Sequence, residues 1–239
     1  MYTAAGNVGP YYGVTLTGNS SNYTTIAQNN TMKGCTMKNF YYYGVYQYYT
    51  NGNQIVNNDI SRANATSGGS SSLYGIYSYY SYSSSRSAQI NGNAIHDLPF
   101  PGATTTTSNL SSYSMIYNFY AYGNTTYRTQ VLGNNVYNIF STTSTTYVGY
   151  VYYPQYIDIQ NNVFDNIQSS GTSATNYTWY IYYPTYITFN KNTVKNVVSN
   201  YYLYNFYIYY PSYIDIVGNT VNNCRQNYTS GYFYNFYIY

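Results

Sequence analysis

The stretch YVYYPQYIDIQNN, residues 150–162, returns as YIYYPTYITFNKN from Tyr180 and as YIYYPSYIDIVGN from Tyr207, and a shortened copy, YIY, begins at Tyr237. The steps between the copies are 30, 27 and 30 residues. A period of this size is typical of solenoids, in which each repeat forms one coil stacked on the previous one. Apolar and polar residues alternate on both sides of the proline. This pattern predicts two short strands with a corner between them, because proline cannot donate to a β-ladder.

The alternation separates an inner from an outer face of each strand. We expect the aliphatic residues in the core, and the tyrosines, Asp158, Thr188 and Asp215 on the outside. One aliphatic column can be followed along the sequence, and we expect it to contain Val14, Val45, Ile76, Ala121, Val151, Ile181, Ile208 and Ile238. It predicts about eight coils in a single domain, residues 1–239. The one long step in this column, from Ile76 to Ala121, contains a Pro-Gly segment and a threonine run, which predict a loop insertion at residues 99–112.

A second signature, apolar-x-[G/N]-N-x-apolar-x-[N/D]-apolar, follows the strands. Asparagine tolerates the left-handed backbone that a sharp corner needs, and stacked amides can hydrogen-bond from rung to rung. We therefore interpret this asparagine column as structural rather than catalytic. It contains Asn58, Asn93, Asn134, Asn162, Asn192 and Asn219.

The segments NNTMKGCTMKNFYYYGVY from Asn29, NGNQIVNNDI from Asn51 and LYGIYSYY from Leu73 resemble known repeats. They are similar to those of the periplasmic copper-processing NosD proteins and of pectate-lyase-like surface β-solenoids. The resemblance implies an all-β, right-handed parallel β-helix. It implies no single function, because such coils occur in polysaccharide lyases, phage tail spikes, adhesins and surface-layer proteins. The coils here are longer than the shortest rungs of that family, and their tyrosine content is far higher.

The composition argues against several classes of function. The chain has 43 tyrosines in 239 residues and only 5% charged residues, with a formal net charge of +3. No cluster of Lys or Arg supports nucleic-acid binding, and no apolar run of about eighteen residues predicts a membrane span. No signal peptide is visible at the start. So few charges suit an extracellular or cell-surface assembly better than a concentrated cytosolic monomer. Cys35 and Cys224 lie several coils apart, too far for a disulfide.

Enzymatic sites have weak support in the sequence. Asp158 and Asp215 share an outward position two coils apart, about 9.6 Å, which is within the range for an inverting carboxylate pair. No basic residue accompanies them in these strands, so we expect solvated surface residues and no enzyme activity. His96 and Asp97 are neighbours on an extended chain and should point to opposite sides, which argues against a catalytic pair. One histidine and no Cys/His cluster predict no zinc site, and we expect no cofactor.

The tyrosine columns are the best functional clue. Whole faces of outward aromatic rings are more than a monomer usually leaves in water, so they should contact another copy or the faces of sugar rings. The columns contain Tyr150, Tyr180, Tyr207 and Tyr237; Tyr152, Tyr182, Tyr209 and Tyr239; Tyr153, Tyr183 and Tyr210; and Tyr156, Tyr186 and Tyr213.

The two ends of the chain suggest self-assembly. The last repeat breaks off at Tyr239, and the start, MYTAAGN, resembles its continuation, so one subunit could complete the final coil of the previous one. Such a contact does not close and would build a filament. Our hypothesis is an extracellular structural β-solenoid that assembles end to end into a filament, sheath or surface layer. The alternative is a carbohydrate-binding or carbohydrate-cleaving β-helix. Glycan attachment is also possible at the N-x-S/T sequons of Asn19, Asn22, Asn29, Asn64, Asn109, Asn124, Asn176 and Asn227.

Overall fold

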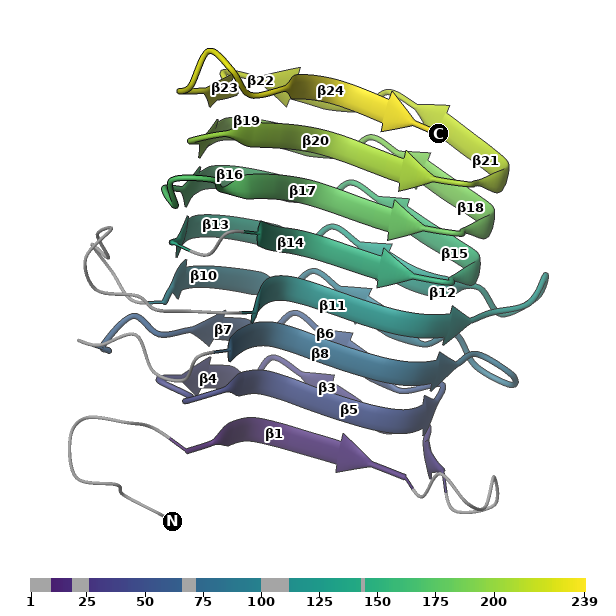
Figure 1. The fold of residues 1–239 in the computed structure, drawn as a ribbon. Helices are drawn as coiled ribbons and strands as arrows, with labels where there is room; N and C mark the ends of the chain where they lie inside the picture. Colours follow the sequence, from purple (N-terminus) through teal and green to yellow (C-terminus); the bar gives the residue numbers. More distant parts are fainter. Residues whose placement is uncertain (1–9, 19–25, 66–71, 100–111, 143–144) are drawn as a thin grey trace.

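The protein is a parallel β-solenoid (Figure 1). A computed structural model describes residues 10–18, 26–65, 72–99, 112–142 and 145–239, and within these ranges it contains 24 strands and no helix. Three strands make one coil, and every coil pairs in parallel with the next. There are seven such coils and one further strand, roughly the eight coils expected. The predicted loop insertion falls almost entirely outside the described residues, as does the N-terminal segment expected to complete a neighbouring coil.

The strands form three faces that run along the stack. The first, here called the tyrosine face, consists of β1 (Tyr12–Thr17), β5 (Tyr43–Asn51), β8 (Ser72–Tyr82), β11 (Ser112–Tyr122), β14 (Thr145–Tyr152), β17 (Thr175–Tyr182), β20 (Tyr202–Tyr209) and β24 (Phe233–Ile238). The second consists of β3 (Thr31–Lys33), β6 (Gln54–Val56), β9 (Gln89–Asn91), β12 (Thr129–Leu132), β15 (Gln155–Gln160), β18 (Thr185–Asn190) and β21 (Ser212–Val217). The third consists of β4 (Thr36–Lys38), β7 (Asp59–Ser61), β10 (Ala94–Leu98), β13 (Asn135–Ser141), β16 (Val163–Ser169), β19 (Thr193–Ser199), β22 (Thr220–Asn222) and β23 (Arg225–Gln226). The short strand β2 (Ala27–Gln28) pairs with β5.

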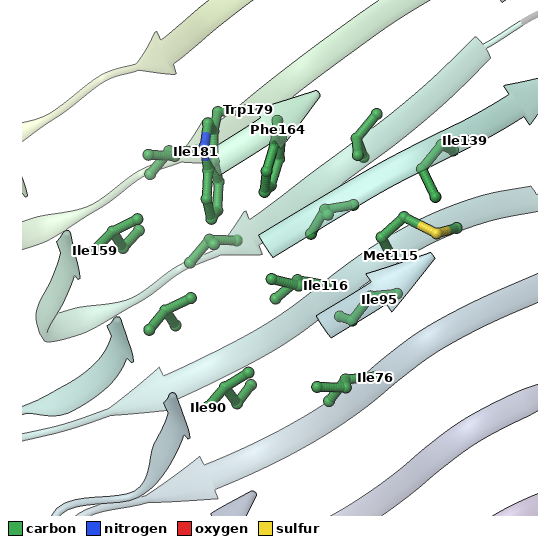
Figure 2. Packing of buried hydrophobic residues seen from close by; sticks show 14 of the residues in the cluster. Ile76, Ile90, Ile95, Met115, Ile116, Ile139, Ile159, Phe164, Trp179 and Ile181 are labelled. Atoms are coloured by element: carbon green, nitrogen blue, oxygen red, sulfur yellow. The ribbon is translucent and has the colours of Figure 1, made fainter. Parts of the chain in front are cut away.

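The expected inner and outer faces are confirmed for the repeated stretch. Val151, Ile159 and Ile181 are fully buried, whereas the flanking tyrosines and Asp158 face outward. Pro154 lies between β14 and β15, where the corner was predicted. Side chains from the three faces meet inside each coil; Ile76, Ile90 and Ile95, from β8, β9 and β10, make one such layer (Figure 2).

The single aliphatic column was wrong in its register. Ile76 pairs with Ile116, which pairs in turn with Gly149, so this column continues through residues other than Val151. The column that contains Val151, Ile181 and Ile208 is occupied in earlier coils by Gln47, Ser78 and Asn118. Ala121 belongs to neither, since it pairs with Ser81. The error arose because the first coils place polar residues inside: the Gln47 side-chain amide donates to the Ser78 hydroxyl at 2.8 Å.

The asparagine column is confirmed as a hydrogen-bonded ladder inside the coils. From Asn58 to Asn192, each side-chain nitrogen donates to the amide oxygen of the asparagine in the next coil, at 2.9–3.0 Å. It also donates to a backbone carbonyl of the preceding coil; for Asn162 this is Val131, at 2.8 Å. The left-handed conformation belongs to the preceding residue instead, such as Gly133 (φ 62°) or Asn161 (φ 57°). The ladder asparagines therefore hold rungs together while their neighbours make the corner.

In one core layer, a large side chain packs over a glycine of the preceding coil. Trp179 is fully buried and stacks on Phe164, with ring centroids 4.8 Å apart (Figure 2). Its register partner in the preceding coil is Gly149, where an added Cβ would lie 2.5 Å from the indole ring. Only glycine leaves room for the tryptophan at that position.

Candidate functional site on the tyrosine face

The outward surface of the tyrosine face is built mainly from one heptad, Y-x-x-Y-x-[YF]-Y, which five strands carry in full, whereas β11 has Ser114 in the first position. It gives YGVYQYY from Tyr43, YGIYSYY from Tyr74, YVGYVYY from Tyr147, YTWYIYY from Tyr177 and YNFYIYY from Tyr204. The fourth residue of each heptad lies in the central column: Tyr46, Tyr77, Tyr117, Tyr150, Tyr180, Tyr207 and Tyr237. The sixth lies in the adjacent column: Tyr48, Tyr79, Phe119, Tyr152, Tyr182, Tyr209 and Tyr239.

Both columns are continuous stacks of rings. In the central column, successive ring centroids are 4.6–5.3 Å apart and the planes diverge by only 2–11°. In the adjacent column the centroid distances are 4.3–5.5 Å. Parallel in-register strands place identical residues one rung apart, and offset stacking adds about 0.5–1.5 kcal/mol per pair beyond area burial. The stacks thus bind each coil to the next.

Two further stacks line the corner between the first and second faces. The seventh heptad residue forms the corner column, Tyr49, Tyr80, Tyr120, Tyr153, Tyr183 and Tyr210, and all six have φ between 48° and 55°. Tyr156, Tyr186 and Tyr213, just after the corner, have φ of 50–57°. A positive φ is rare for a bulky residue and costs on the order of 1–3 kcal/mol. It breaks the alternation, so two successive tyrosines point outward, and the corner rings then stack at 4.5–6.0 Å.

Burial favours the neutral form of several phenols in the central column. Burial raises the pKa of Tyr207 to about 12, and repulsion from ionised Tyr237 and Tyr209 adds to the shift. Burial also raises the pKa of Tyr150 and Tyr180 well above the ordinary value, again with repulsion between neighbouring phenolates as the second cause. An array of neutral phenols can coexist at close spacing without charge repulsion.

All fourteen tyrosines selected from the sequence lie on the outside of the coils. The first half of the same columns, in particular Tyr46, Tyr77 and Tyr117, was not predicted, because the column had been traced through aliphatic residues instead of tyrosines. The heptad was the signal that could have found them. The rings stack face to face, so only their edges and hydroxyls reach solvent along most of each column. Sugar rings stack on exposed aromatic faces, and such faces are scarce here.

The two carboxylates considered for catalysis occupy the expected positions. Asp158 pairs with Thr188 and Thr188 with Asp215, so the two aspartates are two coils apart on the second face. Asp158 is bound by Arg128, whose Nε lies 2.7 Å from Oδ1, and Asp215 accepts from Asn190 at 2.8 Å. Arg128 comes from just before β12, outside the strands that carry the two aspartates. Its Nη2 also donates to backbone carbonyls of two successive coils, which is the behaviour of a structural brace.

The prediction that His96 and Asp97 point to opposite sides was wrong. Asp97 has φ 55°, so both side chains lie on the outside of the third face. His96 Nδ1 lies 2.7 Å from Asp97 Oδ2, and Nε2 lies 2.9 Å from Oδ1 of Asp59 in the preceding coil. The imidazole stacks on Tyr137 with centroids 4.6 Å apart, and Asn138 donates to Asp97. Both imidazole nitrogens are thus bonded to carboxylates, and the arrangement ties three coils together.

The remaining side chains of interest are dispersed. Cys35 and Cys224 are free thiols, the first exposed and the second packed against the core. Among the described residues, no group of three His, Cys, Asp or Glu side chains could hold a metal ion. In the same part of the chain, no helix is long and apolar enough to cross a membrane.

The described sequons differ in accessibility. Asn29, Asn64 and Asn227 are exposed. Asn124 is partly buried, and its amide nitrogen donates to the Ser83 carbonyl at 2.9 Å. Asn176 is fully buried and donates to Ser169 inside the coil, so a glycan on its nitrogen is incompatible with this fold. Asn19, Asn22 and Asn109 lie outside the described residues.

Comparison with known proteins gives no assignment. No protein-family model, curated protein or solved structure matches this sequence significantly.

Proposed function

We propose that the protein is a structural β-solenoid of the cell surface or extracellular space, without enzymatic activity. We propose further that it assembles end to end into a filament, sheath or surface layer. The observation that carries the proposal is the repetition of the same contacts from coil to coil. Each coil contacts the next through stacked tyrosines, asparagine amides and core side chains in register. The surface that best fits one coil is another coil. The low charge of the chain, 5%, favours packing over solvation.

The last described rung gives this proposal a contact surface. Phe206 and Ile208 are fully buried, whereas their counterparts in β24, Phe236 and Ile238, are 43% and 52% exposed. A rung of a second copy placed on β24 would bury Phe236 and Ile238, pair with that strand and extend the tyrosine stacks. The same patch repeated along an open stack would produce a fibre, because a heterologous contact does not close.

A carbohydrate-binding or carbohydrate-cleaving β-helix fits less well. Its aromatic faces would have to be open to sugar rings, and the stacked columns leave mainly ring edges and hydroxyls outward. Its carboxylates would have to be available, and Asp158 is engaged by Arg128. A likeness to NosD-like or pectate-lyase-like solenoids would be consistent with either function, because that fold carries both.

Electron microscopy and sedimentation over a range of concentrations test the proposal. We expect fibres, or particles that grow with concentration, for the wild type. Ile238→Asp should prevent them, since it places a charge in the contact. Ser230→Asp is the matched control, because Ser230 is also exposed on the last rung but lies in a turn. Uniform monomers from the wild type at every concentration would refute end-to-end assembly, and assembly that ignores Ile238→Asp would place the contact elsewhere.

A further inference from the structure

The central column differs from an ordinary aromatic surface because every member can be oxidised. Its seven residues are all tyrosine, each stacked on its register partner at 4.6–5.3 Å. The adjacent column has nearly the same spacing but contains Phe119, which has no phenol, between Tyr79 and Tyr152. The two columns therefore share one geometry and differ in chemistry at a single rung.

We propose that the tyrosine face is an oxidative cross-linking site, at which a one-electron oxidant such as a haem peroxidase with hydrogen peroxide joins register partners as dityrosine. The products are covalent bonds between successive coils of the same solenoid. The inference concerns a modification of the folded chain and does not depend on its assembly.

The geometry favours register partners over other pairs. Within the central column, rings are nearly parallel at about one rung's separation, which places the ortho carbons of two phenols opposite each other. Rings of the same strand are either farther apart, as Tyr150 and Tyr152 are at 6.0 Å, or edge to face, as Tyr177 and Tyr180 are at 5.0 Å with planes 79° apart. Oxidation can begin at the most exposed phenols that line the corner, Tyr210 and Tyr213, which are 47% and 74% exposed. From there an unpaired electron can pass between rings in contact.

The reaction balances with peroxide as the only co-reactant. Each of two phenols gives one electron to the oxidant and its hydroxyl proton to water, which leaves two neutral phenoxyl radicals. These couple through their ortho carbons. Each ortho carbon of the new bond then loses its hydrogen as a proton, and each ring oxygen regains a proton. Both rings are then aromatic phenols again. Peroxide takes up two electrons and two protons to give two water molecules, so each cross-link lowers the mass of the chain by two hydrogen atoms. Because burial raises the pKa of Tyr117 and Tyr150, both enter the reaction as neutral phenols.

Phe119 provides the matched test. In the native chain, β11 should be linked to β14 through Tyr117 and Tyr150, and no link should form in the adjacent column at that rung. Tyr117→Phe should remove the central links from β11 to both neighbouring strands. Phe119→Tyr should add links to Tyr79 and Tyr152, since it adds only an outward hydroxyl. These substitutions lie two residues apart on the same strand and make opposite changes.

The experiment treats each purified chain with peroxidase and peroxide, in buffer and in concentrated urea, and maps the cross-linked peptides by mass spectrometry. We expect intramolecular pairs such as Tyr150–Tyr180 and Tyr180–Tyr207 to dominate only in buffer. The cross-linked chain should unfold at a higher denaturant concentration, by roughly 1 M urea for one such staple. Circular dichroism before oxidation verifies that the variants fold. The proposal fails if native and denatured chains give the same distribution of pairs, if native links are mainly intermolecular, or if Tyr117→Phe leaves the β11 links unchanged.

Discussion

The buried asparagine ladder should contribute strongly to the stability of the solenoid, and exchanging one amide for a carboxylate tests this with little change in shape. Asn162 is fully buried. Its Nδ2 donates to Asn192 Oδ1 at 2.9 Å and to the Val131 carbonyl at 2.8 Å, while its Oδ1 accepts from the backbone and side chain of Asn134 at 3.0 and 2.9 Å. Asn162→Asp keeps both acceptor bonds and turns both donor bonds into contacts between oxygens.

The expected loss can be worked out from these contacts. Two buried acceptors lose a donor, at about 1–3 kcal/mol each, and a buried carboxylate is introduced, so we expect a loss of about 4 kcal/mol at pH 7. That is a large fraction of the 5–15 kcal/mol typical of a domain. With an m-value of about 3 kcal/mol/M, the urea midpoint should fall by roughly 1.3 M. Burial should raise the pKa of the introduced carboxyl, and its protonated form can donate one bond. The deficit relative to wild type should therefore be smaller at pH 4 than at pH 7.

The control is the Asn→Asp exchange at Asn166, four residues after Asn162. Asn166 is exposed in an outer asparagine ladder, where it donates to Asn138 at 2.9 Å, and its φ of 51° is tolerated by aspartate. Asn166→Asp should cost less than about 1 kcal/mol. Fluorescence of the single tryptophan, Trp179, and circular dichroism should follow unfolding in urea. Equal losses for the two variants would refute the reasoning that the inner ladder carries the stability.

Three further predictions concern Gly149, Ile208 and Tyr207. Gly149→Ala should destabilise the fold by about 1–3 kcal/mol, because its Cβ would lie 2.5 Å from the Trp179 ring; thermal unfolding measures this, and adding Trp179→Leu should recover part of the loss. Ile208→Asp should abolish folding because Ile208 is fully buried, whereas Tyr209→Asp, on the outside, should leave the circular dichroism spectrum intact; equal loss would mean that the inner and outer faces are misassigned. The pKa of Tyr207 is about 12 in the folded chain and about 10 when exposed, so folding favours the neutral phenol. Stability should be full below pH 10 and fall as the pH rises from 10 to 12; phenolate absorbance should show fewer ionised tyrosines at pH 11 in the native chain than in urea.

The fold was predictable from the sequence because the last three coils are nearly identical. Their period, alternation and corner prolines indicate a parallel solenoid, and the spacing of the asparagines indicates a ladder. The register of the earlier coils was not predictable from aliphatic residues, because Gln47, Ser78 and Asn118 occupy inner positions there. A polar side chain inside a coil is recognisable only once its partners are known.

The candidate site was half predictable for a related reason. Outward tyrosines could be assigned wherever the alternation held, but the corner residues, such as Tyr49 and Tyr80, have left-handed backbone, and so does Asp97. At each of these positions two neighbouring side chains point to the same side, whereas strict alternation predicts opposite sides. The pairing of His96 with Asp59 and of Arg128 with Asp158 crosses coils, so it depends on the register as well.

The variable length of the coils explains how the ladders stay continuous. Neighbouring tyrosines of the central column are separated in sequence by as few as 27 residues, between Tyr180 and Tyr207, and by 40 between Tyr77 and Tyr117. The extra residues fall outside the paired strands, so the pairs of the described strands keep their register. Selection on such a chain would act on register rather than on length, since a slip of one residue in a strand would turn its tyrosines inward and its aliphatic residues out. The ladders of identical side chains oppose that slip, because each ring or amide binds best to its own counterpart one rung away. The tyrosines are thus both the exposed surface of the solenoid and part of what fixes its register.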